Sequence, residues 1–130
     1  MSYSDLEYEI FSRQFILKNF NENNILKLNN TKITIVGLGG IACPLAQYLV
    51  SSGIKNLTFF DGDVIEKSNL GRQILYNLED IGKFKTFIAK DKLLKTNPKC
   101  NITQQDKRGD ICWELQRGNF RLDLVVLDRV

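Results

Sequence analysis

A glycine-rich turn between a buried strand and a helix constrains the fold of this chain more than any other feature. The run KITIVG at residues 32–37 is short, apolar and rich in β-branched residues, which predicts a buried strand. It leads into the turn GLGGIA at 37–42 and the helical pattern IACPLAQYLVSSG at 41–53. A second apolar run, KNLTFFD at 55–61, predicts the next strand. A strand, a helix and a strand in this order indicate two parallel strands joined by a crossover helix.

The rest of the chain continues this alternation. Within 41–53, four apolar residues share one helical face, and Gly53 is expected to end the helix. These four are Ile41, Leu45, Tyr48 and Leu49. Later elements are expected as a helix at 83–98 that Asn97-Pro98 ends, a weak strand at 101–105, a short helix at 110–119 and a buried strand at 122–128. This order predicts an α/β fold, a Rossmann-like and mostly parallel sheet with helices on both faces.

Length and composition fit one globular domain spanning residues 1–130. The chain is 43% hydrophobic and 25% charged, as in ordinary soluble domains. Residues 1–31 are expected to form an N-terminal helical segment, because apolar residues recur at helical spacing over 6–20 and a short helix fits 21–30. Residues 32–130 are expected to form the core, truncated after about the fourth strand.

The composition and the residue pattern of the chain also exclude several classes of function. No apolar run approaches the ~18 residues that span a bilayer, and the amino terminus lacks a signal core, so we expect a cytoplasmic protein without membrane contact. The chain has no histidine and no CxxC pair, so no metal ligand set is expected. The net charge is only +3, and the lysines around 83–99 lack interleaved exposed aromatics, so we expect no nucleic-acid binding. They are Lys83, Lys85, Lys90, Lys92, Lys95 and Lys99.

The glycine turn has the spacing of a dinucleotide-binding motif. Gly37, Gly39 and Ala42 satisfy G-x-G-x-x-[G/A] between a strand and a helix. In such a motif the first glycine permits the tight turn, the second admits a phosphate and the small third residue lets helix and strand pack closely. Gly40 adds another position without Cβ. The context predicts nucleotide binding, although glycine turns also occur without a ligand.

Acidic residues follow the second strand, and a polar stretch follows them. Asp61 lies where the ribose of an adenosine nucleotide would bind, which does not separate NAD from ATP. An ordinary turn is the alternative for Asp61 and Asp63. The stretch 63–85 carries Arg72 and Lys85, and these cations suit a triphosphate better than a dinucleotide.

Five short motifs in a fixed order then give a specific resemblance. S-R-Q, G-x-G-G, D-x-D, S-N-L-x-R-Q and G-x-x-K occur in sequence over residues 11–130, which resembles the MoeB, ThiF and HesA type of adenylyltransferase in the ubiquitin-activating superfamily. The resemblance implies ATP-dependent adenylation of the C-terminal glycine of a ubiquitin-like sulfur-carrier protein, in thiamine or molybdopterin synthesis. It also implies ATP and Mg²⁺ as cofactors and a homodimer. Such an enzyme aligns two anions and needs no nucleophile of its own.

The resemblance implies a role for each matching residue. Arg72 and Lys85 contact the nucleotide phosphates and are the catalytic candidates within the site. Arg13, of the S-R-Q motif, reaches across the dimer interface into the partner's ATP site. The nucleotide site comprises Gly37, Gly39, Gly40, Asp61, Asp63, Asn69, Arg72, Gln73 and Lys85.

The family pattern is incomplete at the carboxyl end. Asp128 matches the first acid of a D-x-x-D-N segment, and the main Mg²⁺ ligand is expected just beyond Val130. We therefore expect the ATP-binding portion of a longer enzyme. Two other interpretations stay open: a non-catalytic family member that acts as a binding partner, and a NAD-type dinucleotide-binding domain.

Overall fold

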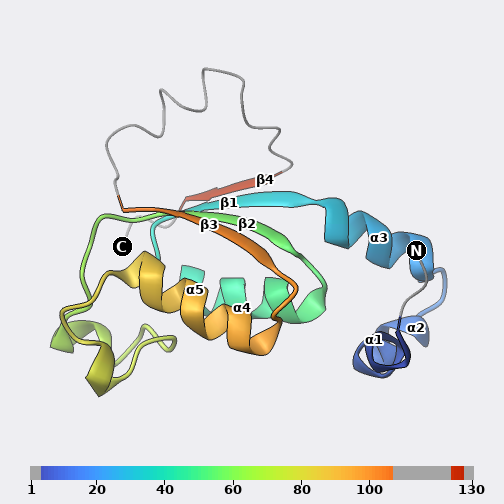
Figure 1. Ribbon diagram of the computed structural model, residues 1–130, viewed down its shortest axis with the longest axis horizontal. Helices are drawn as coiled ribbons and strands as arrows, with labels where there is room; N and C mark the ends of the chain where they lie inside the picture. Colours follow the sequence, from blue (N-terminus) through green and yellow to red (C-terminus); the bar gives the residue numbers. More distant parts are fainter. Residues whose placement is uncertain (1–3, 107–123, 128–130) are drawn as a thin grey trace, which may run out of the picture.

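A four-stranded parallel sheet forms the centre of the molecule. The computed structural model describes residues 4–106 and 124–127. The strands follow the order β3-β2-β1-β4. Each neighbouring pair is parallel, in agreement with the mostly parallel sheet that the sequence predicts. Figure 1 shows the sheet edge-on. The strands are β1 (Lys32–Val36), β2 (Asn56–Phe60), β3 (Asn101–Gln105) and β4 (Leu124–Leu127).

The central strands are apolar because they have neighbours on both sides. In β1, Ile35 pairs with Phe59 of β2 and with Val126 of β4. Ile35 and Phe59 are completely buried, and parallel strands in this position read as continuous hydrophobic runs. The predicted bounds of the first three strands agree with the structure to within one residue.

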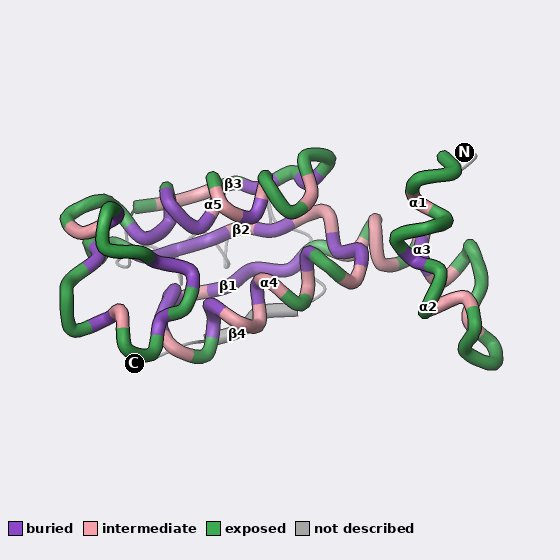
Figure 2. Tube along the Cα trace, turned by 90° about the horizontal axis from the view of Figure 1, so that it is seen from below, coloured by how far each residue is buried: buried purple, intermediate pink, exposed green. Residues whose placement is uncertain are grey.

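Two helices cover one face of the sheet. These are α4 (Ala42–Ser52) and α5 (Lys85–Thr96), which lie side by side across that face (Figure 2). The helix expected at 110–119, and with it the second covered face, lies outside the described residues. None of the helices in the described ranges has the length and apolar character that a membrane crossing requires.

The buried side of α4 differs from its most apolar side. Ile41, which precedes the helix, and Tyr48 are 65% and 76% exposed, although they lie on the face with the largest apolar residues. The buried residues of the helix are small or medium-sized: Ala42, Cys43, Ala46 and Val50. Small side chains let the helix axis approach the sheet closely, which is the reason for a small residue at the third motif position. Gly53 ends the helix in a left-handed conformation, with φ 114°, as predicted.

The N-terminal segment is helical but broken into pieces. The continuous helical spacing over 6–20 is divided into α1 (Asp5–Ile10) and α2 (Ser12–Phe15), and α3 (Glu22–Asn30) leads into β1. The break falls at Phe11, which is buried, and its ring lies 3.5 Å from a Cβ built on Gly53. The chain therefore turns where this ring packs against the end of α4.

Candidate functional site

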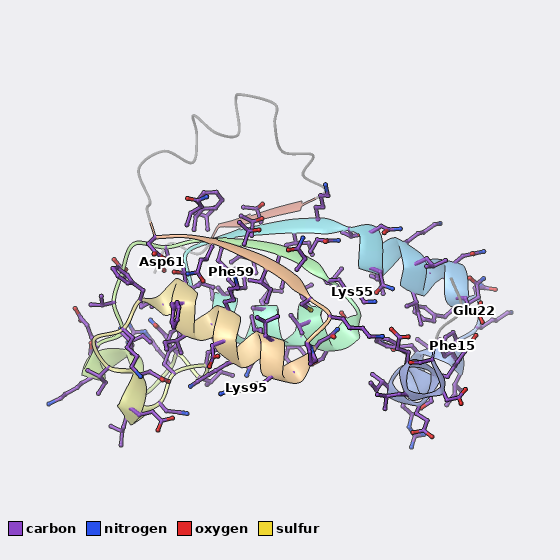
Figure 3. The ribbon with its side chains drawn as sticks, in the orientation of Figure 1. Phe15, Glu22, Lys55, Phe59, Asp61 and Lys95 are labelled. Carbon is purple, nitrogen blue, oxygen red and sulfur yellow. The ribbon has the colours of Figure 1, made fainter. Side chains whose placement is uncertain are left out.

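The carboxyl edge of the sheet is where the strand order reverses. β2 and β3 follow on one side of β1, whereas β4 lies on its other side. In open α/β sheets, ligands bind at this switch point, outside the carboxyl ends of the strands. The glycine turn at 37–41 and Asp61 both begin at this edge, and Figure 3 shows Asp61 there.

The glycine turn has the backbone geometry that its sequence predicts. Gly37 has φ 90°, a conformation that favours glycine, and its N–H donates to the carbonyl of Phe60 at 2.8 Å. Ala42 is completely buried, so the third motif position lies at the helix–sheet contact. No side chain caps the start of α4. In the first turn of α4, the N–H of Cys43 donates to the carbonyl of Gly39 at 3.1 Å, and Pro44 has no N–H.

Asp61 has a structural role that the sequence did not predict. Its carboxylate is completely buried. Oδ2 accepts a hydrogen bond from the N–H of Leu38 at 2.7 Å, and Oδ1 accepts one from the N–H of Asp63 at 2.8 Å. The side chain thus ties the end of β2 to the glycine turn. Its predicted contact with a ribose remains a prediction.

A short antiparallel contact closes the polar insert at 66–81. Val64 and Phe84 form an antiparallel bridge, and the N–H of Lys85 donates to the carbonyl of Asp63 at 3.1 Å. Lys85 becomes the first residue of α5. Its Nζ lies 3.9 Å from Oδ2 of Asp63. The side chain of Lys85 is 6% exposed, and that of Asp63 is 49% exposed. Closing the insert therefore brings two predicted site residues together.

The S-N-L-x-R-Q segment places Arg72 against the glycine turn. Asn69 is buried, and its Oδ1 accepts a hydrogen bond from the N–H of Glu66 at 2.8 Å. Its carbonyl accepts from the N–H groups of Arg72 and Gln73 at 3.1 and 2.9 Å. A Cβ on Gly40 would lie 3.7 Å from Cγ of Arg72. The exposed guanidinium donates from Nη1 to the carbonyl of Ser68 at 2.9 Å, so the stem of Arg72 packs against the turn and its charged end is exposed.

Gln73 is held inside the insert. Its side chain is 1% exposed. Its Oε1 has no hydrogen-bond partner among the residues that the structure describes. A buried acceptor of this kind is costly unless a donor reaches it, so Gln73 retains an open position for a hydrogen-bond donor.

Contacts of the insert include residues that sequence reasoning missed. The hydroxyl of Tyr76 donates to the carbonyl of Leu38 at 2.9 Å. Lys92 of α5 donates from Nζ to the carbonyl of Leu75 and to Oδ2 of Asp80, both at 2.6 Å. Burial raises the pKa of Asp80, but the hydrogen bonds from Lys92 and the Asn77 N–H, with nearby lysine charge, lower it overall. These contacts join distant positions, so no local pattern predicts them.

Arg13 does not join this site within one chain. It is exposed on α2. Figures 1 and 3 show α2, with Phe15, at the opposite end of the sheet from Asp61. The predicted residues of the site itself come from the glycine turn, the end of β2, the insert and the start of α5. Asp128 lies outside the described residues.

No metal centre is formed by the residues that the structure describes. Over 4–106 and 124–127, no group of three or more histidine, cysteine or acidic side chains is arranged to hold an ion. Asp63, the exposed acid of the site, pairs with Lys85. Cys43 and Cys100 are buried, and their thiols donate to the carbonyls of Leu38 and Ile54. Most of the lysines in 83–99 also have partners: Lys85, Lys92, Lys95 and Lys99 each form an ion pair.

The parallel sheet and the glycine turn at its switch point define the Rossmann-like class of α/β domains. Within that class, the chain belongs to the ThiF family, whose sequence pattern matches residues 11–125.

Relatives and solved structures show how much of the family fold is present. The chain is 50% identical over 93 residues to the adenylyltransferase and sulfurtransferase MOCS3 of Drosophila virilis, a match that covers 72% of this chain and 21% of that protein. It is 41% identical over 101 residues to a probable molybdopterin-synthase adenylyltransferase of Gracilaria tenuistipitata var. liui, covering 78% and 28%. The crystal structure of E. coli tRNA N6-threonylcarbamoyladenosine dehydratase, TcdA, in complex with ATP has the same fold. Its TM-score is 0.86 at 23% identity, over 99% of this chain and 52% of that one. The chain thus spans about a quarter of the length of these curated relatives.

Proposed function

We propose that this chain is the ATP-binding portion of an adenylyltransferase that activates the C-terminal glycine of a ubiquitin-like sulfur-carrier protein. The observation that carries the proposal is the packing of Arg72 against Gly40, which joins the polar insert to the glycine turn. A NAD-type domain does not require a cationic insert beside the glycine turn. The relatives named as adenylyltransferases support the same proposed function.

In the proposed reaction, the carrier's carboxylate attacks the α-phosphorus of ATP. A bond forms between the carboxylate oxygen and the α-phosphorus. The bond between the α-phosphorus and the oxygen that bridges it to the β-phosphate breaks, and pyrophosphate leaves with that oxygen. Arg72, whose Cγ and Cδ lie 3.7 and 3.9 Å from a Cβ built on Gly40, brings positive charge beside the glycine turn, where it balances the charge of the phosphates. The proposed contribution of the chain is to align two anions and reduce their repulsion.

Lys85 is proposed as a second phosphate contact. Its Nζ is nearly buried and lies 3.9 Å from the Asp63 carboxylate, a long separation for an ion pair. A loosely held ammonium can turn toward a phosphate oxygen without breaking a strong hydrogen bond. Asp63 then keeps the ammonium near the site in the absence of ligand.

Mg²⁺ is expected to enter with the nucleotide rather than bind first to this part of the chain. The described residues do not fit a magnesium site, because Asp63 is paired with Lys85 and no acidic group of three is present among them. Magnesium usually binds through one or two carboxylates together with substrate phosphates.

The working form is proposed to be a cytoplasmic homodimer. Helix α2, which carries Arg13, lies at the far end of the sheet from the candidate site (Figure 1), so a role of Arg13 in adenylation requires a second copy. The carrier of molybdopterin synthase is the first candidate partner, because one relative carries that name. The carrier for thiamine synthesis is the second.

Calorimetry on purified variants tests the proposal. Arg72→Ala, and Lys85→Met, which keeps the buried stem, should each weaken ATP binding about tenfold or more, since each removes a charge-assisted contact. Lys95→Ala serves as the matched control, because Lys95 is a solvent-exposed cation near the other end of α5. NAD should not compete with ATP.

Pyrophosphate exchange then tests the reaction itself. Labelled pyrophosphate should enter ATP only when a carrier with a free C-terminal glycine is present, in the longest form of the protein that can be expressed. Unchanged ATP affinity in both the Arg72 and Lys85 variants would remove their assigned roles. Tighter binding of NAD than of ATP would favour the dinucleotide-binding alternative.

A further inference from the structure

The peptide between Leu38 and Gly39 is held by a residue of the insert that no motif assigns. Tyr76 is 4% exposed, and its hydroxyl donates to the carbonyl of Leu38 at 2.9 Å. The N–H of Leu38 donates to Oδ2 of Asp61 at 2.7 Å. Two successive peptide groups at the middle of the glycine turn are therefore fixed from opposite sides, one by the end of β2 and one by the insert.

Tyr76 can orient this peptide because its own backbone is anchored. Its N–H donates to the carbonyl of Gln73 at 3.2 Å. The preceding carbonyl, of Leu75, accepts a hydrogen bond from Nζ of Lys92 at 2.6 Å, and Lys92 also binds Asp80. The phenol is thus carried on a turn that is tied to α5, and its ring packs within the hydrophobic core.

The glycine turn needs such an anchor for physical reasons. Gly37, Gly39 and Gly40 lack the Cβ that would restrict their backbones, so ordering them costs more conformational entropy than ordering other residues. The peptide group is planar and trans, so fixing the carbonyl of Leu38 also fixes the direction of the N–H of Gly39. A loop that is ordered before the ligand arrives loses less entropy on binding.

We propose that Tyr76 is a positioning residue for the phosphate site, and that its hydroxyl pre-orders the glycine turn through the carbonyl of Leu38. The inference rests on the proposed function, because it assumes that the turn receives the phosphates of ATP. Tyr76 touches the turn and not the nucleotide. Loss of its hydroxyl should therefore weaken the binding of ligands that carry phosphates and leave the binding of other ligands unchanged.

Tyr76→Phe is the direct test, because it removes the hydroxyl and keeps the ring in the core. ATP affinity, measured by calorimetry on the full chain, should fall about three- to tenfold, the range that one lost hydrogen bond gives. Adenosine affinity should not change, since adenosine has no phosphate. Tyr48→Phe is the matched control, because it removes a hydroxyl from a tyrosine on α4 that is 76% exposed, and it should alter neither affinity.

Amide hydrogen exchange gives a second readout that needs no ligand. The N–H groups of Leu38 and Gly39 should exchange faster in Tyr76→Phe than in the unsubstituted chain, while those of α5 remain unchanged. Normal ATP affinity in Tyr76→Phe would overturn this inference alone. An equal loss for ATP and adenosine, with faster exchange throughout the chain, would also overturn it, because the role would then be structural. Failure of the unsubstituted chain to bind ATP would overturn the proposed function and this inference together.

Discussion

At the scale of single residues, Asp61 is the position in the site where we expect a substitution to cost the most stability. Its carboxylate is buried and accepts hydrogen bonds from two backbone N–H groups, those of Leu38 and Asp63. Asp61→Ala leaves both donors without this partner in a buried place, and each such loss costs about 1–3 kcal/mol. We expect the free energy of unfolding, measured with urea, to fall by about 3 kcal/mol.

Asp61→Asn is the control for this prediction. The amide keeps the shape of the side chain but has one oxygen, so it can replace only one of the two acceptors. The free energy of unfolding of Asp61→Asn should lie between that of the wild type and that of Asp61→Ala. A fully stable Asp61→Ala variant would contradict the structural role of this carboxylate, whatever its effect on ATP.

Prediction from sequence was most complete for residues whose role is local. The motif predicts a tight turn at Gly37, which has a positive φ, and close helix packing at Ala42, which is buried. The hydrogen bond between Tyr76 and Leu38 was not predicted, because it joins residues 38 positions apart. The burial of Asp61 was not predicted either, because its carboxylate binds the N–H of Leu38, which lies 23 positions away.

At the scale of elements, the strands were easier to predict than the helix faces. A strand buried between neighbours is apolar along its length, so its bounds follow from the sequence. Helix α4 instead packs through small residues and leaves Tyr48 exposed, since close contact with the sheet matters more than the size of the side chains. The N-terminal helices were predicted without their break, because Phe11 packs against a residue far along the chain.

The end of α4 offers a test of backbone conformation. Gly53 has φ 114°, and a Cβ there would lie 3.5 Å from the ring of Phe11. Gly53→Ala should lower the free energy of unfolding by about 1–2 kcal/mol, because an L-residue is strained in this conformation. Gly71→Ala is the matched control, since no heavy atom lies within 4 Å of its added Cβ, and it should change stability by less than about 0.5 kcal/mol. Equal effects of the two substitutions would contradict this account.

At the scale of the whole molecule, the two ends of the sheet have different tasks. The carboxyl edge carries the candidate nucleotide site, and the amino edge carries the N-terminal helices (Figure 3). Glu7 of α1 joins these helices to the sheet, because its Oε1 lies 3.7 Å from Nζ of Lys55 and 3.2 Å from Nζ of Lys99. Lys55 and Lys99 shortly precede β2 and β3. Together with the packing of Phe11 against the end of α4, this contact holds the segment that carries Arg13.

The contact of Glu7 should weaken in acid. A hydrogen bond from the Ser4 N–H, against the effect of burial and with help from Lys99, lowers the pKa of Glu7 from 4.5 to about 2. A carboxylate with a lowered pKa stabilises the folded state above its unfolded pKa, and this contribution is lost as the pH falls toward the folded pKa. The amide signals of Asp5–Ile10, followed by NMR, should therefore report release of α1 between about pH 4.5 and pH 2. In Glu7→Gln, α1 should already be loosened at neutral pH, with little further change in acid. Glu9→Gln, an exposed position on the same helix, should behave as the wild type. A Glu7→Gln variant whose α1 signals match those of the wild type at neutral pH would show that other contacts hold the N-terminal helices in place.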